Sequence, residues 1–243
     1  MAIRLDTLLV QRGHAASRAR ARRLIEAGSV RVDGEVVTKP GRTVPEDTEP
    51  ELDEPDIPYA SRAGLKLEAA LDHFRLDPAG VRVLDVGAST GGFTDLLLQR
   101  GAAEVVTVDV GTDQLHPRLR SDPRVRCHER TDIRKVAPAD LGAPFDWLVA
   151  DLSFLGLGVV LPRIRPLVTG ASVVLVLVKP QFEVGPRSVG NGGVVRDPAA
   201  RQAALDRIRG QAGAAGFRPG EAFEVPVPGE SGNREYFLRL EPV

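Results

Sequence analysis

The chain has 243 residues, which allows either one large domain or a medium domain accompanied by a small one. Its 32 basic and 33 acidic side chains give a formal net charge of −1, so the chain as a whole has no basic signature. One cysteine, Cys127, excludes an intramolecular disulfide, and the longest apolar run, residues 173–178, is far too short to span a membrane as a helix. We therefore expect a cytoplasmic protein without a metal centre.

The first forty residues predict two helices followed by a hairpin. Leucines recur at helical spacing in residues 4–13, and a second helix covers residues 18–27 behind an N-cap at Ser17. Residues 30–32 and 35–37 then alternate around an Asp-Gly pair, which is a two-residue turn signal. We expect a small α+β domain over residues 1–44.

Positive charge is concentrated in this small domain. Residues 1–42 carry nine basic side chains against four acidic ones, a net of +5. Arginines on a helix can be merely solvated, but their density here favours contact with nucleic-acid phosphates. The residues that we expect to make this contact are Arg4, Arg18, Arg20, Arg22 and Arg23.

The same region resembles a known RNA-binding module. The pattern is Ser17-Arg18…Leu24-Ile25-x-x-Gly28-x-Val30-x-Val32-Asp33-Gly34…Lys39-Pro40. It is similar to the module first seen in ribosomal small-subunit protein four. The resemblance implies an RNA partner and names no reaction.

An acidic, proline-rich stretch follows. Residues 45–58 contain seven acids and no base, and prolines interrupt both helix and strand pairing. We interpret this stretch as an extended linker that includes the last edge of the small domain. A helical pattern resumes over residues 61–74 and opens the second domain, residues 59–243.

A strand, a glycine turn and a helix come next. The run Val81–Val86 leads into Gly87-x-x-x-Gly91-Gly92, and the next strand ends in Asp109, about twenty residues on, where such sheets place a ribose-binding acid. The turn has neither the dinucleotide fingerprint nor the Gly-Lys-Ser/Thr of a phosphate loop, so it suits a ligand without phosphates, such as S-adenosylmethionine. An ordinary strand-to-helix connection is the alternative. The expected cofactor residues are Asp85, Gly87, Ala88, Ser89, Gly91, Gly92, Phe93, Asp109 and Asp132.

Further strands recur with helical segments between them. Residues 104–109, 124–128, 146–150 and 172–178 predict a parallel sheet covered on both faces. The connection between residues 220–226 and 234–240 is too short for a helical crossover, so these two strands should pair antiparallel. The predicted fold is α/β, that of a class I S-adenosylmethionine-dependent methyltransferase with a mostly parallel seven-stranded sheet and an antiparallel C-terminal hairpin.

Polar residues follow the strands where each one ends. They are Asp85, Asp109, Asp132, Asp151 and Lys179. Strands often end in polar residues because the chain meets water there, but five in succession favour a site at one edge. Pro180 should keep Lys179 extended. Only four of the 32 basic residues are lysines, which suggests that Lys66 and Lys179 are needed as amines.

Six short motifs stand along the second domain. They are Ser61-Arg62-x-Gly64-x-Lys66-Leu67, Asp85-x-Gly87-Ala-Ser-Thr-Gly-Gly-Phe-Thr94, Asp151-Leu-Ser-Phe154, Val178-Lys-Pro-Gln-Phe-Glu183-Val-Gly185, Gly192-Gly-Val-Val195-x-Asp197-Pro198 and Ser231-Gly-Asn-x-Glu235-Tyr-Phe237. These motifs resemble those of the TlyA (haemolysin A) family, whose catalytic domain is FtsJ-like. The resemblance implies cytidine 2′-O-methylation of ribosomal RNA by a Lys-Asp-Lys-Glu tetrad. Matched by position, the tetrad is Lys66, Asp151, Lys179 and Glu235.

Those residue types suit the reaction. A ribose hydroxyl needs help to lose its proton, and we assign Lys179 as the general base, crowded by the charge of Lys66, while Asp151 and Glu235 orient the amines and the hydroxyl. Membrane lysis, a non-catalytic RNA-binding assembly factor and base methylation are the rival functions. The expected partners are ribosomal RNA or ribosomal subunits, and the oligomeric state stays open.

Overall fold

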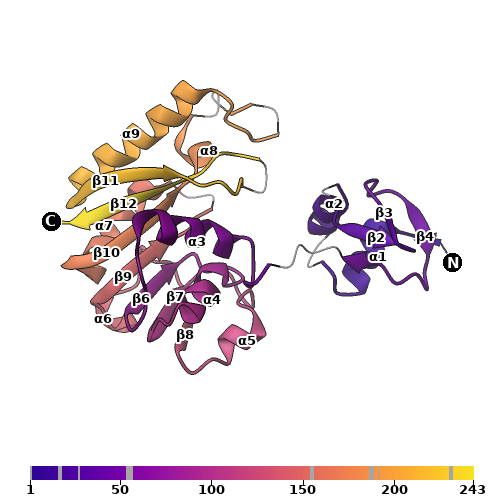
Figure 1. The fold of residues 1–243 in the computed structure, drawn as a ribbon, viewed down its shortest axis with the longest axis horizontal. Coiled ribbons are helices and arrows are strands. Elements are labelled where there is room, and N and C mark those ends of the chain that lie inside the picture. The colour runs from indigo at the N-terminus through magenta and orange to yellow at the C-terminus, as the bar shows by residue number, and fades with distance from the viewer. Residues whose placement is uncertain are drawn as a thin grey trace. The chain divides into compact units, whose positions relative to one another are not determined.

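The computed structural model describes residues 2–15, 18–26, 28–52, 57–153, 156–185, 189–190, 192–229 and 232–243, without the side chains of Ala19, Arg20 and Arg23. It divides into two compact units, Met1–Ile57 and Pro58–Val243, which we describe separately (Figure 1). Ser17, expected to cap the second helix, lies outside the described residues.

The small unit has two helices and two small sheets. Its elements are β1 (Ala2–Arg4), α1 (Leu5–Gln11), α2 (Arg18–Glu26), β2 (Val30–Val32), β3 (Glu35–Val36), β4 (Thr43–Pro45) and β5 (Glu51–Leu52). Its core joins leucines of α1 to Ala21 and Ile25 of α2 and to Val30 and Val32 of β2. β2 pairs antiparallel with β3, as the hairpin signal predicts.

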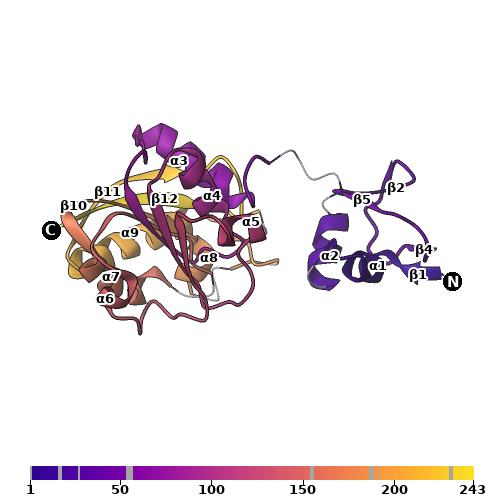
Figure 2. The same ribbon diagram turned by 90° about the horizontal axis from the view of Figure 1, so that it is seen from below.

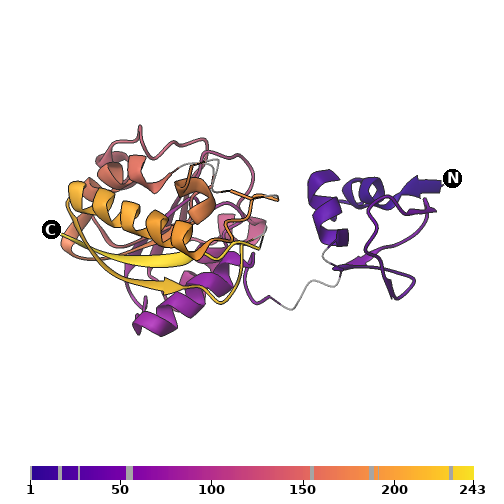
Figure 3. The same ribbon diagram turned by 90° about the horizontal axis from the view of Figure 1, so that it is seen from above.

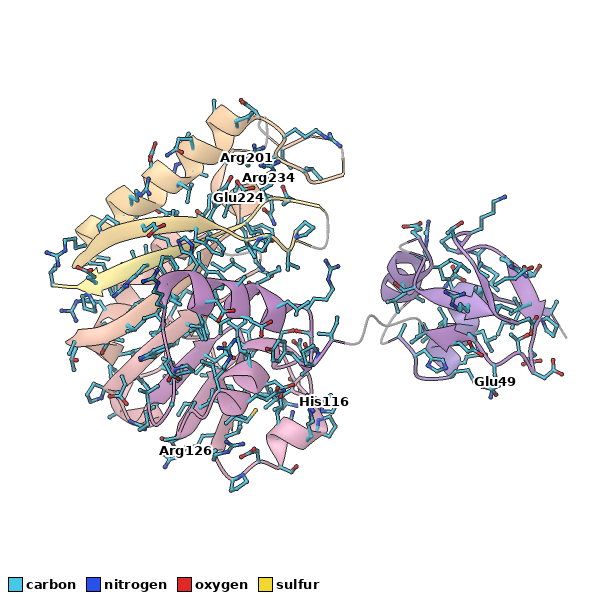
Figure 4. All side chains as sticks on the ribbon, viewed as in Figure 1. Glu49, His116, Arg126, Arg201, Glu224 and Arg234 are labelled. Carbon is cyan, nitrogen blue, oxygen red and sulfur yellow. The ribbon has the colours of Figure 1, made fainter. Side chains whose placement is uncertain are left out.

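Part of the acidic stretch, for which we predicted a linker over residues 45–58 after a domain of residues 1–44, pairs with strands of the small unit. β4 pairs antiparallel with β1, and β5 pairs with the free edge of β2. Proline is compatible with the ends of such short edge strands. The acidic turn between them is also held, because Arg12 forms an ion pair at 2.9 Å with Glu49, which is labelled in Figure 4.

The large unit alternates strands and helices. Its elements are α3 (Ala63–Phe74), β6 (Arg82–Val86), α4 (Gly92–Gln99), β7 (Glu104–Val108), α5 (Pro117–Arg120), β8 (Val125–His128), α6 (Pro138–Leu141), β9 (Phe145–Ala150), η1 (Leu157–Val159), α7 (Leu161–Ile164), η2 (Arg165–Leu167), β10 (Val168–Val178), α8 (Pro180–Glu183), α9 (Pro198–Ala214), β11 (Phe217–Glu224) and β12 (Tyr236–Pro242).

The strands of this unit form one seven-stranded sheet in the order β11-β12-β10-β9-β6-β7-β8. β10, β9, β6, β7 and β8 are parallel, whereas β12 runs antiparallel to both β10 and β11. The predicted fold class, including the antiparallel C-terminal pair, is confirmed. β12 lies inside the sheet between β10 and β11, where it can reach the site.

Helices cover both faces of the sheet. Figures 2 and 3 show α3 and α4 on one face and α6, α7 and α9 on the other. Central strands are apolar on both sides; in β6, for example, Val83 and Leu84 are both fully buried. Burial of one such side chain stabilises the fold by roughly 1.5–3 kcal/mol, so continuous apolar runs are what a doubly covered parallel sheet requires.

Candidate active site

The strand register brings the predicted polar residues to one edge of the sheet. Val86 at the end of β6 pairs with Val108 of β7 and with Ala150 of β9. On the other side, Val178 at the end of β10 pairs with Tyr236 at the start of β12. The residues just beyond these pairs are Gly87, Asp109, Asp151, Lys179 and Glu235. They therefore lie along one edge, as expected for the carboxyl ends of parallel strands.

The four tetrad residues form two lysine–carboxylate pairs. Lys66 Nζ donates a hydrogen bond to Glu235 Oε2 at 2.7 Å. Lys179 Nζ lies 2.5 Å from Asp151 Oδ1 and donates to Ser153 Oγ at 3.2 Å. Lys66, Lys179 and Glu235 are only 8, 9 and 2% exposed. Removing one partner from such a buried pair leaves an uncompensated charge, which costs about 3–5 kcal/mol.

The local backbone explains how the amines are presented. Lys179 has φ −110° and ψ 99°, the extended conformation that we predicted from Pro180. Lys66 lies on α3, which packs closely on the chain before it, since a Cβ on Gly64 would lie 2.5 Å from the ring of Tyr59. Ser153 was missed by sequence reasoning, although it stands two residues after Asp151 at a strand end.

The glycine turn directly contacts the residue that follows β9. Gly87 and Gly91 have φ of 84° and 94°, which side chains other than hydrogen rarely allow. A Cβ on Gly87 would lie 2.2 Å from the backbone oxygen of Asp151. Gly92 is equally confined, by Ser61 Oγ at 2.3 Å from its hypothetical Cβ. The turn and the tetrad are therefore parts of one packed edge.

The other turn residues have distinct environments. Ala88 is buried, and Ser89 adopts a positive φ of 49°. Phe93 is buried with its ring 5.8 Å from that of Phe237, so its side chain packs in the core between α4 and β12.

Asp85 is a buried acid with an unused oxygen. Its Oδ2 accepts a hydrogen bond from Thr94 Oγ1 at 2.7 Å, and Oδ1 has no partner among the described residues. Burial raises the pKa of Asp85 to about 7; the bond from Thr94 opposes that rise, and the charges of Asp151 and Asp109 add to it. Oδ1 is thus an acceptor for a donor that the described residues do not supply.

Asp109 organises the neighbouring loop. Its Oδ2 accepts from the backbone N–H of Ser89 at 2.8 Å, and its Oδ1 accepts from that of Gly111 at 2.7 Å. Each oxygen keeps a second lone pair for a ligand hydroxyl. The next residue, Val110, is 71% exposed and offers an apolar surface beside the acid. Val110 was not among the predicted cofactor residues, although an aliphatic residue directly after a carboxylate at a strand end could have pointed to it.

Asp132 follows β8 at the same edge but is already engaged. Its carboxylate accepts from the backbone N–H and the guanidinium of Arg134, with Nη2 at 2.7 Å from Oδ2. These bonds lower the pKa of Asp132 to about 2. A ligand would share this carboxylate with Arg134.

In the small unit, a buried carboxylate orients two of the predicted RNA-binding arginines. Asp6 is fully buried and accepts from Arg4 Nη2 at 2.8 Å and from Arg18 Nη2 at 3.2 Å. The bonds from Arg4 are the main reason that the pKa of Asp6 falls to about 2. Arg22 is exposed. The side chains of Arg20 and Arg23 lie outside what the structure describes.

Two classes of feature are absent from the described part of the chain. It contains no group of three or more potential metal ligands. It also contains no helix with the length and apolar character needed to cross a membrane.

Comparisons with known proteins agree with this geometry. Residues 59–241 match the family of FtsJ-like methyltransferases, and residues 3–49 match the S4 domain. The chain is 46% identical to "16S/23S rRNA (cytidine-2′-O)-methyltransferase TlyA" of Mycobacterium tuberculosis, over 98% of this chain and 89% of the relative. It is 34% identical to "Hemolysin A" of Brachyspira hyodysenteriae, over 98% of this chain and 99% of that protein.

A solved structure is also similar over the full length. A hemolysin-named protein of Streptococcus thermophilus matches with a TM-score of 0.80 and 38% identity, covering 100% of this chain and 89% of the other. Similarity of this extent includes both units.

Proposed function

The chain belongs to the FtsJ-like methyltransferase family, and from that premise we propose that it transfers a methyl group from S-adenosylmethionine to a ribose 2′-hydroxyl, that of cytidine, in ribosomal RNA. The observation that carries the proposal is the pair of buried lysine–carboxylate contacts beside the glycine turn. Such a protein works where ribosomes are, so we place it in the cytoplasm.

The residues at the edge fit S-adenosylmethionine. Asp109 suits the ribose diol, exposed Val110 suits the adenine face, and the free Oδ1 of Asp85 suits a cationic amine. The turn offers no lysine or arginine that would require a phosphate. When bound, the cofactor supplies an electrophilic methyl group on a sulfonium.

The chain's own residues then have to align and deprotonate the ribose hydroxyl. The ribose hydroxyl would accept the methyl group on its oxygen, and the hydroxyl proton would pass to a base of the protein. We assign that base as Lys179, with Asp151 and Ser153 fixing the position of its Nζ. Lys66, held by Glu235, places a positive charge beside the oxygen as it becomes anionic.

We expect cofactor binding to release protons near neutral pH. The pKa of Asp85 is raised to about 7, so this carboxyl is largely protonated at pH 6. A cationic ligand favours the ionised form, which lowers that pKa and expels the proton. Affinity should therefore rise with pH up to about 7. Calorimetry at pH 6 in buffers of different ionisation enthalpy measures the released proton.

Asp85→Asn is the control for that release, because the amide is isosteric and cannot titrate. The released proton should vanish in this variant. Release of the same size in Asp85→Asn would mean that another group titrates.

RNA binding should depend on the arginines of the small unit. Arg22→Glu, and Arg18→Glu with it, should weaken RNA binding, and each lost phosphate contact should lower the slope of log K against log salt by about 0.7–0.9. Arg22→Glu is the cleaner variant, because Arg18 also neutralises buried Asp6. Binding is measured across a salt series.

Arg218→Glu is the matched control, because Arg218 is an exposed arginine of β11 that is paired with Glu241. It should leave the slope unchanged, and every variant should keep its cofactor affinity. An unaltered slope in Arg22→Glu would mean that this helix face is only solvated.

The proposed reaction itself is tested by incubating the protein with ribosomal subunits and labelled S-adenosylmethionine, followed by mass mapping of the RNA. Label on the ribose of a cytidine is the expected product. Label on a base would replace the proposal with base methylation. Cofactor binding without any transfer would favour the assembly factor.

Membrane lysis is the rival that the name of the Brachyspira relative raises. A liposome-leakage assay without RNA or cofactor tests it, and we expect no leakage. The buried amines paired with carboxylates have no evident role in membrane lysis, whereas methyl transfer uses them directly.

A further inference from the structure

The buried side chain of Asn233, just before β12, is hydrogen-bonded to the backbone of residues 193–195, just before α9. Asn233 is only 1% exposed. Its Oδ1 accepts from the backbone N–H of Val195 at 2.9 Å, and its Nδ2 donates to the backbone oxygen of Gly193 at 2.8 Å. Both ends of the amide are therefore used, although the methyl-transfer mechanism gives this residue no task.

The backbone of Asn233 in turn fixes a glycine. The backbone oxygen of Asn233 accepts from the N–H of Gly229 at 2.9 Å, and the N–H of Gly232 donates to the oxygen of Gly229 at 2.8 Å. These contacts close the loop that precedes β12. The position of Gly229 is thereby tied to that of Asn233.

Gly229 lies against the carboxylate of Glu235. A Cβ built on Gly229 would lie 2.4 Å from Glu235 Oε1 and 3.0 Å from its Cδ. The other oxygen, Oε2, is held by Lys66 Nζ at 2.7 Å. The Glu235 carboxylate is thus confined on one side by Lys66 and on the other by Gly229, where an added Cβ would require the carboxylate to shift.

The backbone of Glu235 is held separately. Its carbonyl accepts from the N–H of Val225 at 2.9 Å, and the following residue, Tyr236, pairs with both Val178 and Glu224. The strand pairs fix the backbone of Glu235, but they do not fix the position of its carboxylate. Gly229 limits that position from one side, and we call this contact the wall.

We propose that Asn233 and Gly229 are positioning residues that hold the Glu235 carboxylate on Lys66. The inference rests on the proposed methyl transfer, since it assigns these residues a part in that reaction. Asn233 fixes the position of Gly229, and Gly229 forms the wall against the Glu235 carboxylate. Neither residue touches the reacting atoms.

Gly229→Ala is the direct test, measured as the single-turnover rate of methyl transfer to ribosomal RNA. The added methyl must displace Glu235, so the rate should fall at least tenfold while the affinity for S-adenosylmethionine stays within twofold. Gly210→Ala makes the same chemical change on α9, where a Cβ would meet nothing within 4 Å, and should keep the full rate. Asn233→Ala should reproduce the loss of rate.

A double variant separates positioning from general damage. Glu235→Asp shortens the side chain by one methylene and relieves the clash with the new methyl. The cost of Glu235→Asp should therefore be smaller in the Gly229→Ala background than alone, a non-additivity that a structural defect would not produce. The ¹³C signal of the Glu235 carboxyl should also move in Gly229→Ala.

The outcomes are distinct. If the unaltered protein transfers methyl and Gly229→Ala keeps more than half of its rate, the inference is wrong. If the unaltered protein transfers no methyl, the proposed function fails, and the carboxyl signal then decides whether the wall exists. An unchanged ¹³C signal of the Glu235 carboxyl in Gly229→Ala would mean that Gly229 does not position this carboxylate.

Discussion

Lys179→Arg should abolish nearly all methyl transfer while cofactor and RNA still bind. The guanidinium keeps the positive charge and can still pair with Asp151, but it cannot lose its proton near neutral pH. Positioned general bases contribute about 10²–10⁴-fold in rate, and the loss should lie in or above that range. Single-turnover kinetics on ribosomal RNA measure it, with binding of both ligands determined separately.

Lys66→Arg is the matched control for this prediction. Lys66 is a buried amine on a carboxylate, as Lys179 is, but in our assignment it acts through its charge. Its exchange should therefore be milder. If Lys179→Arg kept more than about a tenth of the original rate, Lys179 would only position the hydroxyl and the base would have to be sought elsewhere.

Asp109→Ala should weaken S-adenosylmethionine binding by roughly 2–3 kcal/mol, or about 30- to 150-fold. Two ligand hydroxyls would lose their acceptor, and the backbone N–H groups of Ser89 and Gly111 would lose theirs. Calorimetric titration measures the affinity directly.

Asp122→Ala provides the comparison for that titration. Like Asp109, Asp122 accepts from a backbone N–H, that of Arg124, and it accepts from the guanidinium of Arg124 as well. It stands before β8, at the opposite end of the strand from Asp132. Its removal should leave the affinity unchanged. Equal affinities in both variants would exclude Asp109 from the cofactor site.

The sequence predicted the edge of the sheet because the positions of strand ends are a local property. Asp85, Asp109, Asp151 and Lys179 each follow an apolar run, and the parallel order then puts them together. Glu235 came only from the resemblance, since no local pattern relates it to Lys66. Nor could the sequence predict which amine pairs with which carboxylate, because side-chain contacts across strands determine that.

Other features depended on three-dimensional neighbours that no local rule contains. The role of Asn233 needs the loop at residues 193–195, and the wall at Gly229 needs the carboxylate of Glu235. Residues 51–52 form a strand only because β2 offers a free edge. In each case the missing information was the identity of the partner.

The placement of β12 inside the sheet also bears on the order of folding events. Two hydrogen bonds at the glycine turn join residues nine and twenty positions apart, whereas Lys66 and Glu235 are 169 positions apart. Closing the longer loop costs about 2 kcal/mol more in chain entropy than closing one of twenty residues. A partly folded chain that has not yet inserted β12 beside β10 lacks the carboxylate that holds Lys66, even where its glycine turn has formed. We therefore expect the glycine turn to form before the contact between Lys66 and Glu235 does.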